Sequence, residues 1–421
     1  MTATGDRELR RAMHGMLRCV QPSPAPVDAI IQRGKGIRLR SRRRARAAAV
    51  AAAVAVVAFI IPARIGAPGH GPGSAGPQRP ATDDVAAQVE RELTGPTAPI
   101  STAANRVRKP IPGRYFPAGI AITPDGKTAY VLNGFSGTVI PISTATNMPG
   151  KPIKVAPGPG MIAITPDGKT AYAANYPSGT VIPISTATNT PGKPIKVGPG
   201  PGFIAITPDG KTAFAANSAS DTVVPISTAN NVPGKPIKVG LGPGLISVTP
   251  DGKTAYAADY ASGTIVPIST AAKMPGKPIN VGPGPGFIAI TPDGKTAYAA
   301  LCNDPRSPSG TVVPINTTTN VPGKPINVGP GAGFIAITPD GKTAYVVGAF
   351  TLTPISTATD TPGKPIHIGS DITIAITPDG KTVYAATWAT VIPISTATNT
   401  PGHPIRIGPG PPAGIEFNAV L

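Results

Sequence analysis

Seven aspartates recur at one position of a repeated hexapeptide, and together they could do the chemistry of a hydrolase. Carboxylates gathered around a channel can hold a divalent cation or transfer protons. The hexapeptide is Thr-Pro-Asp-Gly-Lys-Thr. Its composition also gives each Asp a local reason, because Pro presets φ at a turn, Asp bonds nearby backbone, and Gly accepts the left-handed conformation. We therefore interpret all seven as turn residues: Asp125, Asp167, Asp209, Asp251, Asp293, Asp340 and Asp379.

Other catalytic residue types are sparse. The chain has two cysteines and four histidines: Cys19, Cys302, His14, His70, His367 and His403. Neither a Ser-His-Asp arrangement nor a metal-ligand spacing can be recognised among them, and two distant cysteines make no disulfide framework. We expect no catalytic residue, no metal and no cofactor.

The repeat is interrupted once by an insertion. The fifth copy gains five residues and contains Asn303, Asp304 and Arg306. Recognition residues tend to lie on irregular loops of a rigid scaffold. These three are therefore candidate binding residues, although neutral drift in a loop explains the insertion as well.

The hexapeptide itself defines a tandem array. Four of its six intervals are 42 residues and the other two are 47 and 39. A fixed period of this length indicates one supersecondary unit repeated along the chain. The seven copies begin at Thr123, Thr165, Thr207, Thr249, Thr291, Thr338 and Thr377.

One repeat contains four short apolar runs separated by turn residues, which predicts four antiparallel strands. In the third hexapeptide copy they span 203–207, 212–217, 222–227 and 235–239. Such a unit is typical of a propeller blade. The 55 prolines and 50 glycines exclude stacked helical repeats. The predicted fold is all-β.

The two ends of the array bear on how the ring closes. The half-repeat Pro-Ile-Ser-Thr/Lys-Pro-Ile has an extra copy at Pro99–Ile111, and Pro412–Val420 resembles a degenerate inner strand. Propellers avoid open sheet edges by closing on themselves. We predict a seven-bladed β-propeller of four-stranded blades. The alternative has eight blades, with a composite closing blade built from both ends.

The ends of the second strands carry a family resemblance. They contain Tyr-Val-Leu-Asn (130–133), Tyr-Ala-Ala-Asn (172–175), Phe-Ala-Ala-Asn (214–217) and Tyr-Ala-Ala-Asp (256–259). With the hexapeptide before them and Ser-Gly-Thr-Val after them, these segments resemble the YVTN family of β-propeller repeats. The resemblance covers about three quarters of the chain. It implies a seven-bladed propeller, frequent in surface-layer and secreted proteins of prokaryotes, and no single activity.

The last residue of each of these motifs is polar only in the first four repeats. Later copies have Leu301, Gly348 and Thr387 there. A role shared by this position would belong to Asn133, Asn175, Asn217 and Asp259, which we take as further binding candidates. Some related propellers are lactonases with metal-binding channel acids, and others are lyases, so the resemblance leaves an enzyme open.

The segment before the array is different in kind. Residues 1–46 carry 12 Lys and Arg against 3 Asp and Glu, and residues 47–63 are uncharged and apolar. This pattern predicts a transmembrane signal anchor with a basic cytoplasmic tail and an exported ring. Residues 64–97 form a Gly/Pro/Ala-rich linker and 98–421 the propeller. The alternative is a cleaved signal peptide, which would make the protein secreted.

Half of the net charge of +18 lies in residues 1–46. Arginines beside an apolar span are an orientation signal, so we do not assign nucleic-acid binding. The outer strands of the first three repeats carry Lys154, Lys196 and Lys238, and the later repeats have Asn280, Asn327, His367 and Arg406 at this position. One side of the ring would therefore attract anionic polymers, although protection of the sheet edge explains these lysines equally well. The sequence predicts a membrane-anchored, extracytoplasmic, monomeric ring that binds a protein or an anionic cell-envelope polymer. The alternative function is a lactonase-like or lyase-like enzyme.

Overall fold

The computed structural model describes residues 100–101, 106–107, 117–133, 136–156, 158–302, 310–369, 373–386 and 390–406, and its elements there are β-strands. The predicted basic tail, membrane anchor and linker lie outside these residues, as do Asn303, Asp304 and Arg306. Within the described part of the chain, no helix has the length and apolar character that a membrane crossing requires.

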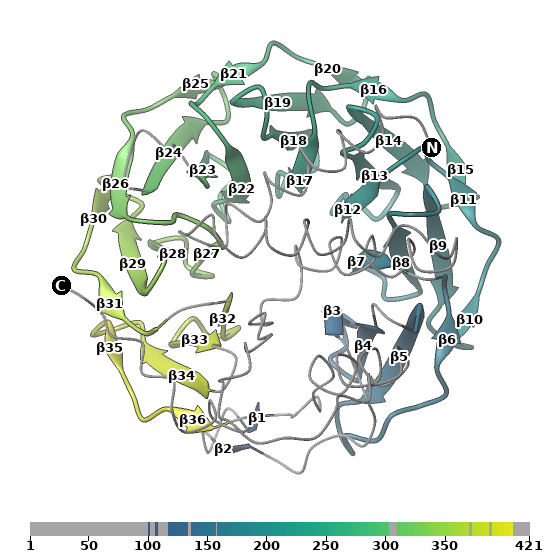
Figure 1. Ribbon diagram of the computed structural model, residues 1–421, viewed down its shortest axis with the longest axis horizontal. Helices are drawn as coiled ribbons and strands as arrows, with labels where there is room; N and C mark the ends of the chain where they lie inside the picture. The colour runs from purple at the N-terminus through teal and green to yellow at the C-terminus, as the bar shows by residue number, and fades with distance from the viewer. Residues whose placement is uncertain are drawn as a thin grey trace, which may run out of the picture.

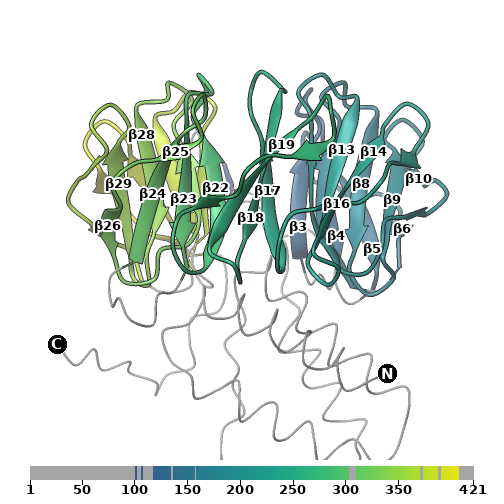
Figure 2. The ribbon, with the colours of Figure 1, turned by 90° about the horizontal axis from the view of Figure 1, so that it is seen from above.

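Seven antiparallel sheets stand around a central opening, so the predicted seven blades are confirmed (Figure 1). We number them blades 1 to 7 in chain order. The inner strands are β3 (Pro117–Ile122), β7 (Pro159–Ile164), β12 (Pro201–Ile206), β17 (Pro243–Val248), β22 (Pro285–Ile290), β27 (Ile335–Ile337) and β32 (Thr373–Ile376). In Figure 2 the strands run between the two faces of the ring.

The second and third strands of each blade are the longest paired segments. The second strands are β4 (Thr128–Asn133), β8 (Thr170–Asn175), β13 (Thr212–Asn217), β18 (Thr254–Asp259), β23 (Thr296–Leu301), β28 (Thr343–Val347) and β33 (Thr382–Ala386). The third strands are β5 (Thr138–Ser143), β9 (Thr180–Ser185), β14 (Thr222–Ser227), β19 (Thr264–Ser269), β24 (Gly310–Asn316), β29 (Thr351–Ser356) and β34 (Thr390–Ser395).

The fourth, outer strand is split in two in blades 2 to 7. Its first pieces are β10 (Thr190–Pro191), β15 (Val232–Pro233), β20 (Met274–Pro275), β25 (Val321–Pro322), β30 (Thr361–Pro362) and β35 (Thr400–Pro401). Its second pieces are β11 (Ile195–Lys196), β16 (Ile237–Lys238), β21 (Ile279–Asn280), β26 (Ile326–Gly329), β31 (Ile366–His367) and β36 (Ile405–Arg406). Blade 1 has β6 (Ile153–Lys154) and a single bridge, Ile142 to Pro149.

This split accounts for the proline inside each third strand. In blade 2, β9 pairs with β10 at Ile184 and Ser185 and with β11 at Thr180 and Val181. Pro183 lies opposite the break, and its carbonyl accepts the Gly192 N–H at 2.7 Å. The outer residue opposite Pro183 is Gly192, which is exposed, so water can satisfy the Gly192 carbonyl and the missing N–H of proline is tolerated.

Neighbouring blades pack through small residues and one long side chain. Ala171 and Ala173 are fully buried, which lets adjacent sheets approach closely. Buried Tyr172 sends its hydroxyl to the next blade, where it donates to Asn231 Oδ1 at 2.7 Å. Burial raises the pKa of this phenol to about 12, so it stays a donor at any physiological pH. The same bond to the next blade forms at four other interfaces: Tyr130–Asn189, Tyr256–Asn320, Tyr298–Asp360 and Tyr345–Asn399.

Blades 3 and 4 replace both members of this pair together. Phe214 stands where the tyrosine would be, and Lys273 stands where its acceptor would be. The Lys273 ammonium lies 6.0 Å from the Phe214 ring centroid and 3.4 Å from Thr212 Oγ1. A cation over an aromatic ring thus takes the place of the hydroxyl–amide bond.

One further hairpin precedes blade 1. Strand β1 (Ile100–Ser101) pairs with β2 (Arg106–Val107) in the register Ile100 to Val107. In Figure 1 this hairpin lies between blade 7 and blade 1, and β2 contacts β36. The extra half-repeat of the sequence therefore has its own place in the ring.

Candidate functional site

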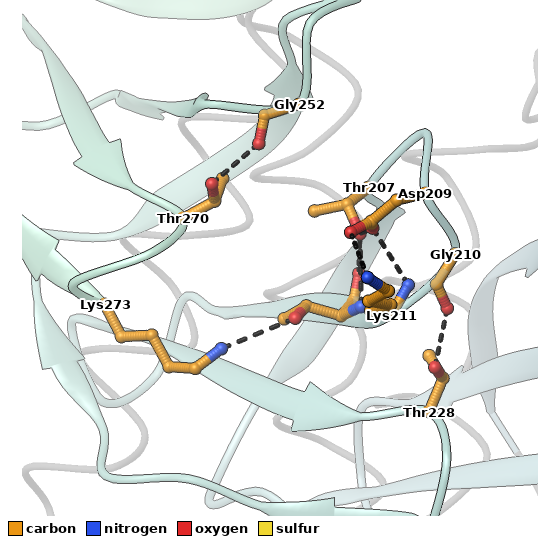
Figure 3. Close-up of polar contacts among 9 residues, drawn as sticks. Thr207, Asp209, Gly210, Lys211, Thr228, Gly252, Thr270 and Lys273 are labelled. Carbon is orange, nitrogen blue, oxygen red and sulfur yellow. Dashed lines mark hydrogen bonds and ion pairs between the residues drawn. The ribbon is translucent and has the colours of Figure 1, made fainter.

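The seven turn aspartates are held by local bonds, as the sequence predicts. In blade 3, Thr207 Oγ1 donates to Asp209 Oδ1 at 2.6 Å, and the Lys211 amide donates to the same oxygen at 3.0 Å (Figure 3). The Thr207 bond is the main cause that lowers the pKa of Asp209. A carboxylate that is satisfied within its own turn has little capacity left for catalysis.

The same turn is tied to the rest of its blade. Thr228 Oγ1, which follows the third strand, donates to the Gly210 carbonyl at 2.6 Å, and Thr270 bonds Gly252 in the same way in blade 4 (Figure 3). Lys211 also lies 3.9 Å from Asp209 Oδ2, but its side chain is 82% exposed. One face of the ring therefore consists of regular turns with solvated lysines.

The polar residues that end the second strands lie on the opposite face, and they are buried. Asn133, Asn175, Asn217 and Asp259 are between 0% and 5% exposed. Asn175 shows what the position does: its Nδ2 donates to the Ala156 carbonyl, and its Oδ1 accepts from the Ser178 amide and hydroxyl. It joins its own turn to the connection arriving from blade 1. Asn217 Nδ2 likewise donates to the Val197 carbonyl at 2.6 Å. Their role in ligand binding stays a prediction.

Asp259 is the carboxylate in this set. Among the described residues neither of its buried oxygens has a hydrogen-bond partner, and Asn217 Oδ1 is the other buried side-chain oxygen in this position without one. The Ser262 hydroxyl and the backbone amides of Ser262 and Leu241 lie near the carboxyl group but outside hydrogen-bonding geometry. They lower its pKa, but by less than burial raises it. Burial dominates and raises its pKa from 3.8 to about 6, helped by the negative charge of Asp221. Asp221 itself accepts the Gly242 N–H at 2.8 Å.

The central opening is framed by strands without catalytic side chains. In the parts that the structure describes, the seven inner strands carry no Asp, Glu, His or Cys. Their polar side chains are Ser247, whose hydroxyl donates to the Ile288 carbonyl, and Thr373. No group of three or more potential metal ligands occurs among the described residues. The channel wall thus offers small and apolar groups.

The outer edge is different, because it gathers exposed lysines. In blades 1 to 3 the motif Lys-Pro-Ile-Lys buries its isoleucine and exposes both lysines: Lys151 and Lys154, Lys193 and Lys196, Lys235 and Lys238. We call these six residues the basic edge. Among the described residues, the ion pairs all join a turn Asp to its turn Lys, so the basic edge is left without acidic partners.

The second lysine of the motif is confined to blades 1 to 3. Blades 4 and 5 retain the first lysine but have Asn280 and Asn327 in place of the second, and blades 6 and 7 have His367 and Arg406 there. A groove lies on the outer surface between blades 4 and 5, lined by Lys253, Lys277, Met274 and Val321 among others. The asymmetry of the lysines can be predicted from the sequence alone, because aligning the repeats identifies the outer-strand positions at which lysine is replaced.

Comparison with known proteins identifies the fold and no family. No family model matches the chain, and no curated protein matches it. Among solved structures, hydrazine synthase from Kuenenia stuttgartiensis matches with a TM-score of 0.55 at 23% identity, covering 69% of this chain and 95% of that one. The dihydro-heme d1 dehydrogenase NirN matches with a TM-score of 0.63 at 15% identity, covering 73% and 70%. A protein of unknown function from Desulfotomaculum acetoxidans DSM 771 matches with a TM-score of 0.50 at 20% identity, covering 65% and 93%. These likenesses show that the chain is a β-propeller.

Proposed function

We propose that the protein is a non-enzymatic binding scaffold whose basic edge takes an anionic cell-envelope polymer. The carrying observation is the row of six exposed lysines on blades 1 to 3, free of acidic partners among the described residues. Lysines are compact, strongly hydrated charges that bind phosphate and carboxylate without demanding one geometry. Repeated at each blade, they suit a ligand that is itself a chain of repeated negative charges.

The location proposed for this scaffold rests on the sequence. The apolar stretch 47–63, with its basic flank, would anchor the chain in the membrane and leave the ring on the outer side, and cleavage of this stretch would release the ring. The resemblance to YVTN repeats, frequent in surface-layer and secreted proteins, supports the same location. A monomeric ring is proposed, because each blade edge is blunted by charge and proline.

The test compares two triple variants of equal charge. One is Lys154→Asn, Lys196→Asn and Lys238→Asn, which gives blades 1 to 3 the residue found in blades 4 and 5. The control is Lys127→Asn, Lys169→Asn and Lys211→Asn, which removes three turn lysines from the same blades. The probe is long-chain polyphosphate, with affinity measured at two salt concentrations.

We expect the first variant to lose on the order of 2–3 kcal/mol of binding at low salt, at about 1 kcal/mol per lysine near a charged surface. The control should lose much less, and the affinity of the unmodified protein should fall with salt. Equal losses in both variants would show unspecific attraction by net charge. No polyphosphate binding, with capture of a discrete envelope protein instead, would favour a protein partner.

An enzyme is the second candidate, because two of the structural neighbours are named as enzymes. At 23% and 15% identity they carry the fold alone. A lactonase-like activity would need acids or histidines from segments other than the described inner strands, such as the inserted loop with Asp304. Hydrolysis of simple lactones with added divalent metal, abolished by Asp304→Asn, would establish this alternative.

A further inference from the structure

The buried core of the ring is divided into clusters that each join two consecutive blades. The pair of blades 1 and 2 shares one cluster, and so does every following pair up to blades 6 and 7. A closed ring of seven would need a seventh shared cluster, between blades 7 and 1. Among the described residues the remaining cluster, Val131, Ile140 and Ile142 with Ala129, belongs to blade 1 alone.

The inner part of this blade 1 face is open. Ile120 and Ile122 on β3 are 55% and 58% exposed. The residue equivalent to Ile120 in blade 2 is Ile162, which is 4% exposed because blade 1 covers it. Burial of apolar side chains stabilises a fold, so an exposed pair of isoleucines on an otherwise regular strand marks a missing neighbour.

Blade 7 presents the other side of the same opening. Tyr384 and Ala386 on β33 are only partly buried, and Ala375 on β32 is exposed. The equivalent tyrosines in the other blades are at most 1% exposed. Two apolar faces therefore border one position, which we call the eighth position.

The outer half of the eighth position is already occupied. The β1–β2 register, Ile100 with Val107 and Ser101 with Arg106, reproduces that of β9 with β10, Ile184 with Pro191 and Ser185 with Thr190. The hairpin lies between blades 7 and 1 and contacts β36 (Figure 1). It takes the place of a third strand and the start of a fourth strand beside the seven blades, and no strand among the described residues occupies the inner half of the position.

We propose that the chain's own C-terminal segment, Pro412–Phe417, docks into the eighth position as its inner strand. After β36 the sequence continues Ile-Gly-Pro-Gly (407–410), which matches Val-Gly-Pro-Gly (197–200), the connection from β11 into inner strand β12. One additional residue, Pro411, follows this connection. Pro-Ala-Gly-Ile-Glu-Phe (412–417) then matches Pro-Ala-Gly-Ile-Ala-Ile (117–122), which is β3.

The pattern of this segment suits the site. Ile415 and Phe417 are two residues apart, so in a strand they share one face. By the equivalence with Ile120 and Ile122, that face turns toward blade 7 and its partly buried Tyr384. Both termini of the chain would then close the ring.

The experiment measures protection of a cysteine on β3. Ile122→Cys is introduced with Cys19→Ser in the full chain, and its rate of maleimide labelling is compared with that in a chain ending at Pro411. The matched control is Ile164→Cys, the equivalent residue of β7, which blade 1 covers in both proteins. We expect labelling at position 122 to be at least about ten-fold faster in the shortened chain, as local opening governs access to protected sites, and labelling at position 164 to be unchanged.

A second variant keeps the test decisive if the shortened chain does not fold. Phe417→Asp in the full chain should also expose position 122, and Glu416→Ala should raise the melting temperature, since the equivalent residues are the small Ala121, Ala163 and Ala205. Equal labelling of position 122 in all these proteins would overturn the proposal. Protection that depends on protein concentration and accompanies a dimer would overturn it as well, in favour of a second copy filling the position.

Discussion

The two faces of the ring differ in how strictly they repeat. On the face of the hexapeptide turns, the bonds among Thr, Asp and Lys recur in all seven blades. On the opposite face, the residue that ends the second strand is Asn in blades 1 to 3, Asp in blade 4 and Leu in blade 5. The turn closes a single blade, so each copy needs it. The strand end joins two blades, and such a contact can be made in more than one way.

Replacing a glycine by alanine should have very different costs on the two faces. The largest loss of unfolding free energy is expected on the face of the strand ends. A Cβ on Gly240, whose φ is +126°, would overlap Asp259 Oδ2. Gly240→Ala should therefore cost more than about 3 kcal/mol of unfolding free energy, since the fully buried Asp259 side chain must shift and an L residue is strained at this φ. Gly126→Ala, on the turn face, meets nothing within 4 Å and carries only the strain of φ +70°. It should cost about 1 kcal/mol. Urea unfolding of both variants tests the contrast, and equal losses would contradict it.

Asp259→Asn should remove the irregularity of blade 4 and stabilise the ring. Asn at this position donates to the incoming connection in blades 2 and 3, as Asn175 and Asn217 do. The pKa of Asp259 is raised from 3.8 to about 6, so its folded form binds the proton more tightly than the unfolded form. The contribution of Asp259 to the free energy of unfolding is thus most favourable below about pH 4. It declines as the pH rises toward 6 and stays low above that value.

The gain from Asp259→Asn should accordingly depend on pH. We expect on the order of 2 kcal/mol at pH 7 and little at pH 4, allowing for solvent screening of the shift. Unfolding free energies measured at both values check this, with Asn217→Asp as the reciprocal variant, which should introduce the same pH dependence in blade 3. A gain from Asp259→Asn that is equal at pH 4 and pH 7 would show that Asp259 does not titrate in this range.

A single turn should matter less than a buried strand end. Thr207→Val removes the hydroxyl that donates to Asp209 and accepts from the Thr212 amide at 3.1 Å. We expect a loss of about 1 kcal/mol at neutral pH. Because hydrogen bonding lowers the pKa of Asp209, this contribution exists above the unfolded pKa and is lost as the pH falls through the folded one. The difference between variant and parent should therefore shrink in acid.

The repeat predicts what is local and misses what joins blades. The strands, the Pro-Asp-Gly turns and the blade number follow from alternation and turn chemistry within 42 residues. The bond from Tyr172 to Asn231 spans 59 residues, and only the paired change to Phe214 and Lys273 in the sequence could have indicated it. The asparagines at the strand ends are binding candidates from the sequence, but Asn175 is buried, and its turn folds back and supplies the Ser178 amide.

The smallest effect should come from the turn lysines, although they are the most regular charges in the molecule. Lys211 is 3.9 Å from Asp209 Oδ2, with its own side chain 82% exposed. Exposed ion pairs of this kind contribute little, because water and salt screen them. Lys211→Ala should change the unfolding free energy by less than about 0.5 kcal/mol, in contrast to Thr207→Val in the same turn. A larger loss, sensitive to salt, would mean that the lysines stabilise the turn face collectively, and the strict repetition of that face would then have an electrostatic cause as well as a local one.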